Sequence, residues 1–210
     1  MITVLDVETS FVEHNGKTDP LPFNPHNKLV SVGANDDYYF FYHRDSEFDV
    51  QKNHKDLQET LDNTTLLVGH NIKFDLVWLL ESGFKYEGRL YDTMIAEYVL
   101  LRGLRKPLSL KEICKRRSIS QKSDAISTRA LFDSQIADFK KEDNRGLLKS
   151  VKMMNEFLPV LGEMERNGIN IDVPGLDEVE ILFKEEFGTI AQRIKHIIWE
   201  QMGDTPLNPA

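Results

Sequence analysis

The 210-residue sequence predicts an α/β domain followed by a helical extension at the C-terminus. Short runs rich in β-branched and aromatic residues alternate with longer amphipathic stretches over most of the chain. One long helical stretch then runs from Pro174 to about Met202. A domain usually takes about 100 to 200 residues, so the chain is long enough for one domain plus an extension. Hydrophobic residues make up 40% and charged residues 29%, which is typical of a soluble globular protein.

The first half of the chain predicts four strands and two helices. We expect strands over residues 1–8, 28–34, 38–43 and 65–68, and helices over 54–61 and after Asn71. A polar loop containing Asn15-Gly16 separates the first two strands, and the turn signal Asn35-Asp36-Asp37 makes the second and third strands a hairpin.

The second half predicts mainly helices. Asp92 is well placed as the N-cap of a helix that ends near Leu101. A short basic helix buries Leu110, Ile113 and Cys114, and residues 118–128 form a polar loop. Helical pattern resumes near Leu131 and reaches about Glu165, with a kink or division at Pro159. We read residues 203–210 as a linker, as expected of a fragment.

The sequence also excludes several classes of protein. No apolar run approaches the roughly 20 residues of a membrane helix, and Met1 leads directly into a strand rather than into a signal segment. Cys114 is the only cysteine, so an internal disulfide is impossible. We therefore expect a cytoplasmic protein, in the host cytoplasm if it is phage-encoded, with no membrane partner.

Two carboxylates mark the end of the first strand. Side chains of alternate strand residues share a face, so Asp6 and Glu8 lie about 7 Å apart along it. Oxygen ligands of this kind favour hard cations such as Mg²⁺ or Mn²⁺ over zinc. The alternative is a solvated strand end, where acids are common.

A second group of polar residues follows the strand at 65–68. Asp75 falls in the first turn of the next helix, where the helix dipole alone stabilises an acid, so a structural role remains open. His70 fits a packed loop residue as well as a ligand, and Asp92 fits a structural cap.

The charge distribution is uneven. The net charge of −8 argues against a polyanionic partner, because Lys and Arg supply most of the affinity for phosphates. Eight bases nevertheless stand against one acid between Arg102 and Lys122. This basic patch is either a solvated helix face or a surface that follows a nucleic-acid backbone.

Three motifs in order resemble the exonuclease motifs of the DEDD superfamily. They are Leu5-Asp6-Val7-Glu8-Thr9, then Gly69-His70-Asn71-Ile72-Lys73-Phe74-Asp75, then Phe139-x-x-x-Asp143, whose two ends share a helical face. The whole is most similar to the 3′–5′ proofreading exonuclease domain of family A DNA polymerases. Tyr91-Asp92-Thr93-Met94 and residues 159–172 also resemble that family.

The resemblance implies an RNase H-like α/β fold with a mixed central sheet flanked by helices. It also implies two ions, Mg²⁺ or Mn²⁺, held by Asp6, Glu8, Asp75 and Asp143. The partner would be the 3′ end of a single DNA strand. The sites it implies for substrate are Asn71 and, at the end of the first strand, Thr9.

The resemblance further implies three parts of the chain. Residues 1–158 would be the exonuclease domain, 159–172 a connector, and 173–210 the start of a polymerase domain whose remainder is absent. One residue departs from the family pattern. The tyrosine usually found four residues before the last acid is Phe139, which lacks the hydroxyl that would orient the attacking water.

Two other functions fit the sequence. One is a structural or binding module that keeps the exonuclease fold without turnover, an alternative that Phe139 supports. The other is an RNase resembling ribonuclease D, against which the connector-like residues 159–172 weigh.

Overall fold

The computed structural model describes residues 1–14, 17–43 and 47–202. The chain divides into two compact units, Met1–Asn167 and Gly168–Ala210. The predicted turn at Asn15-Gly16 and the predicted linker at 203–210 lie outside the described residues.

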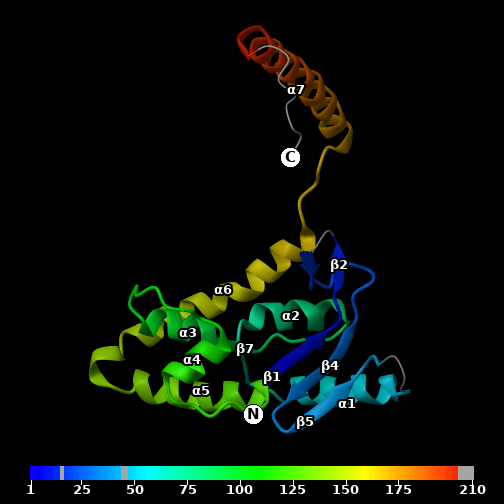
Figure 1. The fold of residues 1–210 in the computed structure, drawn as a ribbon. Helices are drawn as coiled ribbons and strands as arrows, with labels where there is room; N and C mark the ends of the chain where they lie inside the picture. Colours follow the sequence, from blue (N-terminus) through cyan, green and yellow to red (C-terminus); the bar gives the residue numbers. More distant parts are fainter. Residues whose placement is uncertain (15–16, 44–46, 203–210) are drawn as a thin grey trace. The chain divides into compact units, whose positions relative to one another are not determined.

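The first unit is built on a mixed five-stranded sheet in the order β5-β4-β1-β6-β7 (Figure 1). Its strands are β1 (Ile2–Thr9), β4 (Leu29–Ala34), β5 (Asp37–Phe40), β6 (Leu66–Gly69) and β7 (Arg89–Asp92). The central strand β1 pairs antiparallel with β4 and parallel with β6, and β6 pairs parallel with β7. A separate hairpin joins β2 (Val12–His14) to β3 (Lys17–Asp19).

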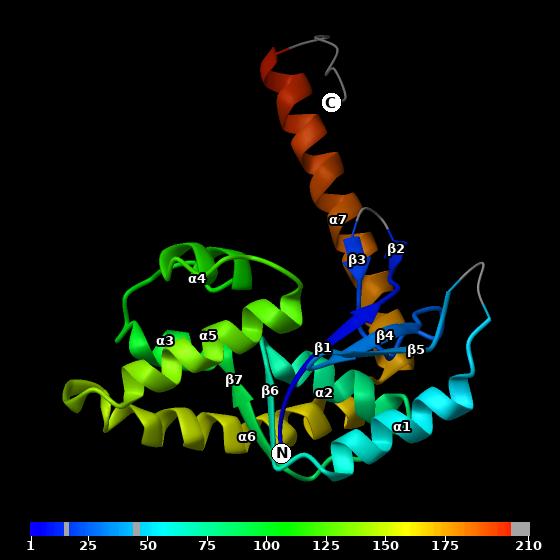
Figure 2. The same cartoon turned by 90° about the horizontal axis from the view of Figure 1, so that it is seen from below.

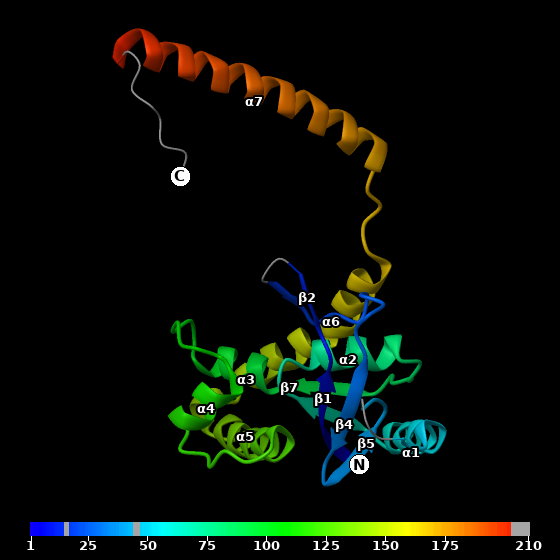
Figure 3. The same ribbon diagram turned by 45° about the vertical axis from the view of Figure 1, so that its right-hand side comes forward.

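Helices cover both faces of this sheet. They are α1 (Val50–Asp62), α2 (Ile72–Glu81), α3 (Thr93–Leu100), α4 (Leu110–Arg116), α5 (Asp124–Phe139) and α6 (Leu147–Asn167), with a short 3₁₀ helix η1 (Glu142–Asn144). Figures 2 and 3 show α1 and α5 on opposite sides of β1. The expected α/β architecture, a mixed sheet flanked by helices, is thus confirmed.

Side chains of β1 point alternately to the two faces of the sheet, and each face carries a hydrophobic core. Leu5 and Val7 point into a core that includes Leu57 of α1 and Leu76 of α2. Val4 points to the other face, where it packs with side chains of β6, β7, α5 and α6. Because side chains alternate along a strand, Asp6 lies on the face that Val4 shares with α5.

The parallel ladder between β1 and β6 is short. Its register pairs Ile2 with Leu66, Thr3 with Leu67 and Val4 with Val68, and goes no further. The chain then turns from β6 into α2, with Asn71 at a positive φ of 62°. Beyond Val4, the edge of β1 that pairs with β6 therefore has no strand partner. The polar residues Asp6 and Glu8 lie in this part of β1.

Several elements differ from those predicted. The predicted hairpin of residues 28–34 and 38–43 is present as β4 and β5, but β7 and the β2–β3 hairpin were missed. The expected continuous helix from about 131 to 165 is two helices, α5 and α6, and Pro159 lies inside α6. The first turns of α5 occupy residues read from the sequence as a polar loop.

The second unit contains a single long helix, α7 (Val173–Met202). Much of its apolar surface faces solvent, including Phe183, Phe187 and Trp199, which are 70%, 75% and 61% exposed. No helix in the described ranges is long and apolar enough to cross a membrane.

Candidate acid site at the end of the central strand

Asp6 and Glu8 lie where β1 runs past the end of β6. Asp6 is partly buried on the α5 face, and Glu8 is exposed. The register of β1 against β4 shifts between Glu8 and Thr9. Such an irregularity twists the strand locally, so the two acids stand at the point where regular pairing stops.

Asp75 reaches this point from α2. Its side chain is buried, and Oδ1 accepts a hydrogen bond of 2.9 Å from the backbone N–H of Val7. This carboxylate replaces the strand partner that Val7 lacks beyond the end of the β1–β6 ladder. The bond fixes the helix that carries Asp75 against the strand that carries Asp6 and Glu8.

These acids perturb one another. Burial, then the charges of Asp124 and Glu8, raise the pKa of Asp6 from 3.8 to about 6. Burial and the charge of Asp6 raise the pKa of Asp75 well above its ordinary value, against the opposing effect of the Val7 hydrogen bond. The site therefore concentrates negative charge without a protein cation to balance it, because no Lys or Arg in the described residues pairs with these side chains.

Asp124 is the fourth acid of the site, and the sequence reasoning missed it. It is the first residue of α5, directly after the N-cap Ser123, and its carboxylate is exposed. The missed signal was Ser123-Asp124 followed by helix-forming residues, the pattern of a helix start. We refer to Asp6, Glu8, Asp75 and Asp124 as the acid site.

The structure does not bring Asp143 to these residues. Asp143 is exposed in η1, beyond the far end of α5. A helix from Asp124 to Phe139 rises about 22 Å, so its far end is remote from the acid site. Phe139 is 3% exposed and belongs to the hydrophobic cluster that also contains Phe132 and Val151, which explains why this position is apolar.

Asp124, unlike Asp143, is among the acids whose charges act on Asp6. The residue four positions before Asp124 is Ser120, which is exposed.

The donor set fits hard divalent cations. The donor set consists of four carboxylates, without a thiolate or an imidazole. Burial, and then the charges of Asp124 and Glu8, raise the pKa of Asp6. As placed, no three acids, histidines or cysteines of the described residues lie close enough to hold an ion. Glu8 and Asp124 are exposed and have no side-chain partner within those residues, so they are free to rotate toward Asp6.

The turn between β6 and α2 is held by other polar groups. His70 Nε2 donates to the carbonyl oxygen of Leu108 and Nδ1 contacts Thr93 Oγ1, both at 2.9 Å. With both ring nitrogens engaged, His70 is a packing residue of this turn. Asn71 remains exposed near the turn, and Thr9 is half-buried beside Glu8.

Asp92 has the structural role expected from the sequence. Its carboxylate accepts bonds from the backbone N–H groups of Asn71 and Ile72 at the start of α2, and of Met94 and Ile95 at the start of α3. One side chain therefore caps two helices.

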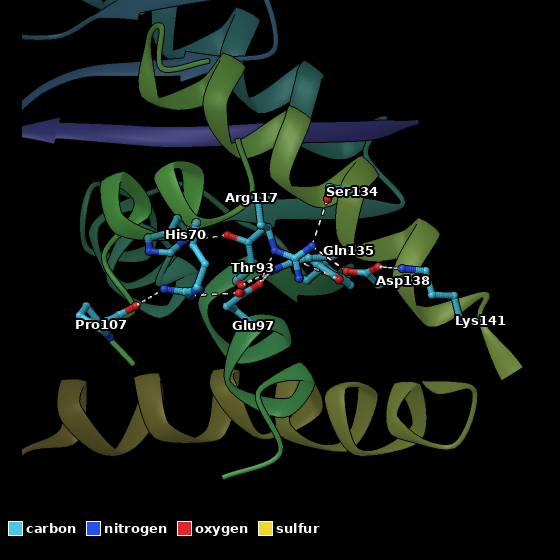
Figure 4. A network of polar contacts seen from close by, with 11 residues as sticks. His70, Thr93, Glu97, Pro107, Arg117, Ser134, Gln135, Asp138 and Lys141 are labelled. Atoms are coloured by element: carbon cyan, nitrogen blue, oxygen red, sulfur yellow. Dashed lines mark hydrogen bonds and ion pairs between the residues drawn. The ribbon is translucent and has the colours of Figure 1, made fainter. Parts of the chain in front are cut away.

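A network of ion pairs joins α3, α4 and α5 (Figure 4). Buried Glu97 binds Arg116 at 3.0 Å and Arg117 at 2.7 Å, and accepts a bond from Gln135. Arg117 continues to Asp138 at 2.7 Å. The paired groups satisfy one another, so the network fixes α4 onto its neighbours.

A family model described as 3′-5′ exonuclease matches residues 24–139, which is more than half of the chain. No curated protein matched the sequence.

Several solved structures share the fold at low identity. Brucella melitensis NrnC with bound Mg²⁺ has a TM-score of 0.58 and 20% identity, over 82% of this chain and 90% of that one. The same protein bound to pGG has a TM-score of 0.55 and 19% identity, over 82% of this chain and 89% of that one. A structure described as the apo form of the nuclease has a TM-score of 0.56 and 18% identity, over 81% of this chain and 88% of that one. The mixed sheet flanked by helices is therefore the RNase H-like fold of exonucleases.

Proposed function

Because the chain belongs to the 3′-5′ exonuclease family, we propose that its acid site hydrolyses the 3′-terminal phosphodiester bond of a single nucleic-acid strand. The observation that supports this most strongly is the hydrogen bond between Asp75 and the backbone N–H of Val7, which sets Asp75 beside the strand that carries Asp6 and Glu8. The charge of Asp124 also acts on Asp6. These acids come from β1, α2 and α5, and they have no protein cation among them in the described residues.

The four acids would hold two ions, Mg²⁺ or Mn²⁺. When bound, such ions supply an activated water and stabilise the leaving 3′ oxygen. The charges of both Glu8 and Asp124 act on Asp6, so these three carboxylates would help to hold the ions. Positive charge nearby lowers the pKa of a carboxyl group, which keeps Asp6 and Asp75 ionised at neutral pH.

The remaining residues of the site would position the substrate. Asp75 is immobilised through Val7, whereas exposed Glu8 and Asp124 adjust to ions and phosphate. Exposed Asn71 and half-buried Thr9 lie on the chain next to Asp75 and Glu8, where the terminal nucleotide would bind. With Asp124 as the last acid of the third motif, Ser120 would stand where the family usually has a tyrosine.

We further propose that this activity proofreads for a DNA polymerase. The resemblance of residues 159–172 to the joining segment of family A polymerases supports this context. The exposed apolar side chains of α7 also support it, because a helix with this surface requires a partner to pack against. Residues 1–158 would then be the exonuclease domain, and α7 would open the polymerase domain. The compact unit extends to Asn167, so α6 crosses the boundary expected at 158.

An RNase is the second candidate function. The solved structure of Brucella melitensis NrnC bound to pGG supports it, because that protein shares the fold of this chain. The proposal of a polymerase context depends on DNA being the preferred strand.

The test uses 5′-labelled single-stranded DNA and RNA 20-mers with Mg²⁺ or Mn²⁺. Wild type should shorten the strand from its 3′ end and release nucleoside 5′-monophosphates. Asp6→Asn should reduce the rate by at least about 100-fold, since removing groups that only support metal ligands already costs about 10- to 100-fold. Glu59→Gln, an exposed change on α1, is the matched control.

Each result has a defined meaning. Equal rates for wild type and Asp6→Asn would contradict the proposed chemistry. Faster cleavage of RNA than of DNA would favour the RNase function over proofreading. If neither DNA nor RNA is hydrolysed with Mg²⁺ or Mn²⁺, the remaining function is that of a structural or binding module without turnover.

A further inference from the structure

The basic patch between Arg102 and Lys122 separates into two groups in the structure. Three arginines are used within the protein. Arg102 donates to the carbonyl oxygen of Asp143 and to Asn144 Oδ1, and Arg116 and Arg117 bind Glu97. Their role is to hold the fold, so they are not free to bind a phosphate chain.

The other five bases are exposed. Within the described residues, their side chains make no ion pair or hydrogen bond; they are Arg105, Lys106, Lys111, Lys115 and Lys122. We define the α4 basic surface as the three lysines of α4 and the loop after it, Lys111, Lys115 and Lys122.

Local geometry places these three lysines together. Lys111 and Lys115 are four residues apart on α4, so they lie one above the other on the same side of the helix, about 6 Å apart along its axis. Ile113 and Cys114 face the core. Gln121 Nε2 donates to the carbonyl oxygen of Lys111, which brings the loop containing Lys122 back against α4.

Two connections link α4 to the segments that carry Asp75 and Asp124. The carbonyl oxygen of Leu108, two residues before α4, accepts a bond from His70 in the turn that leads to Asp75. At the other end, Asp124 follows Lys122 by two residues. The Glu97 network fixes α4 between these two points (Figure 4).

We propose that the α4 basic surface binds the phosphodiester backbone of the substrate strand upstream of the nucleotide that is removed. Lysines without a protein partner can bind phosphate without first breaking an ion pair, and binding releases counterions from the strand. The surface would attract a long strand toward an acid site that repels phosphate until ions are bound. This inference rests on the proposed function and adds the path of the strand to it.

The test compares two triple variants with equal changes in net charge. Lys111→Gln, Lys115→Gln and Lys122→Gln remove the α4 basic surface. Lys52→Gln, Lys55→Gln and Lys85→Gln remove three exposed lysines on and beside α1, on the opposite side of β1 from α5 (Figure 3). All six positions are exposed, so both proteins should fold, which circular dichroism verifies.

The measurement is kcat/KM with Mg²⁺ at 50 and 200 mM NaCl, on single-stranded DNA and RNA 20-mers and on a 5′-phosphorylated dinucleotide. Each lost phosphate contact reduces the salt slope by about 0.7 for a single strand, so three contacts reduce it by about 2. Over this fourfold change in salt, wild type should lose about 20-fold more activity on 20-mers than the α4 variant. Both 20-mers should respond alike, because DNA and RNA share the phosphodiester backbone.

The dinucleotide separates binding of the upstream strand from damage to the acid site. Its hydrolysis should change less than about twofold in the α4 variant, because three contacts upstream of the cleaved bond lie beyond its length. A 20-mer salt slope equal to that of wild type, or an equal loss on dinucleotide and 20-mer, would overturn the inference.

Failure of the proposed function gives a different result. If wild type hydrolyses no substrate, anisotropy of the labelled 20-mers with each protein still measures the salt slope of binding. A salt slope of binding that is reduced in the α4 variant alone would then support strand binding by the α4 basic surface and contradict the nuclease function. Equal salt slopes in all three proteins would contradict both proposals.

Discussion

Neutralising Asp6 should stabilise the protein when no divalent ion is present. Burial and the neighbouring charges of Asp124 and Glu8 raise the pKa of Asp6 from 3.8 to about 6. The folded protein therefore holds this proton more tightly than the unfolded chain, and stability is lost as pH rises between these two values. The loss is complete above pH 6 and corresponds to about 3 kcal/mol, at about 1.4 kcal/mol per pKa unit.

The variant Asp6→Asn removes this loss because an amide does not ionise. We expect its free energy of unfolding in EDTA to exceed that of wild type by up to about 3 kcal/mol at pH 7.5, and by about half as much at pH 5. For a unit of this size the difference at pH 7.5 corresponds to roughly 6 to 12 °C in Tm. Urea and thermal denaturation followed by circular dichroism provide both values, with Glu59→Gln as a control that should not differ from wild type.

Divalent ions supply the second half of the test. Mg²⁺ should raise the Tm of wild type and have a much smaller effect on Asp6→Asn, since a ligand stabilises only the folded protein that binds it. The reasoning is refuted if Asp6→Asn is no more stable than wild type at pH 7.5 in EDTA.

Three further predictions distinguish the acid site from its surroundings. Asp124→Asn should lower the single-turnover rate on a DNA 20-mer by at least about 100-fold, whereas the rate of Asp143→Asn should stay within about twofold of wild type. A large loss in Asp143→Asn together with a small loss in Asp124→Asn would instead assign the third motif to Asp143. Phe139→Tyr should lower the free energy of unfolding by about 1 to 3 kcal/mol, because its hydroxyl enters an apolar core, and should leave the cleavage rate unchanged. A faster rate in that variant would contradict the core placement. Glu97→Gln removes the carboxylate shared by two arginines, so urea denaturation should show a loss of about 3 kcal/mol, and a loss below about 1 kcal/mol would mean that water replaces the carboxylate.

The positions of Asp6, Glu8 and Asp75 in the fold could be predicted because local sequence pattern determines the strand and the helix that carry them. Asp6 and Glu8 end a strand whose alternation is visible in the sequence, and Asp75 follows a strand-to-helix turn containing Gly69. Each acid is within a few residues of the element that positions it.

Asp124 could not be found in the same way. Its charge acts on Asp6 because α5 packs across the sheet, and the two residues are more than 100 positions apart in the sequence. Residues 118–123 are mostly polar and resemble a loop, so the start of the helix was not recognised, and the apolar pattern became clear only near Leu131. Phe139 and Asp143 have the spacing expected of the third motif, and the structure places Phe139 in the core.

Asp92 lies in the same region as the acids that we assign to chemistry, and its single carboxylate anchors the first turns of both α2 and α3. An alanine scan scored by lost cleavage would therefore report Asp92 as strongly as Asp75, for a different reason. Removing Asp92 would release the start of the helix that carries Asp75. A mutational screen of this domain therefore needs a thermal denaturation measurement for each variant as well as a cleavage rate.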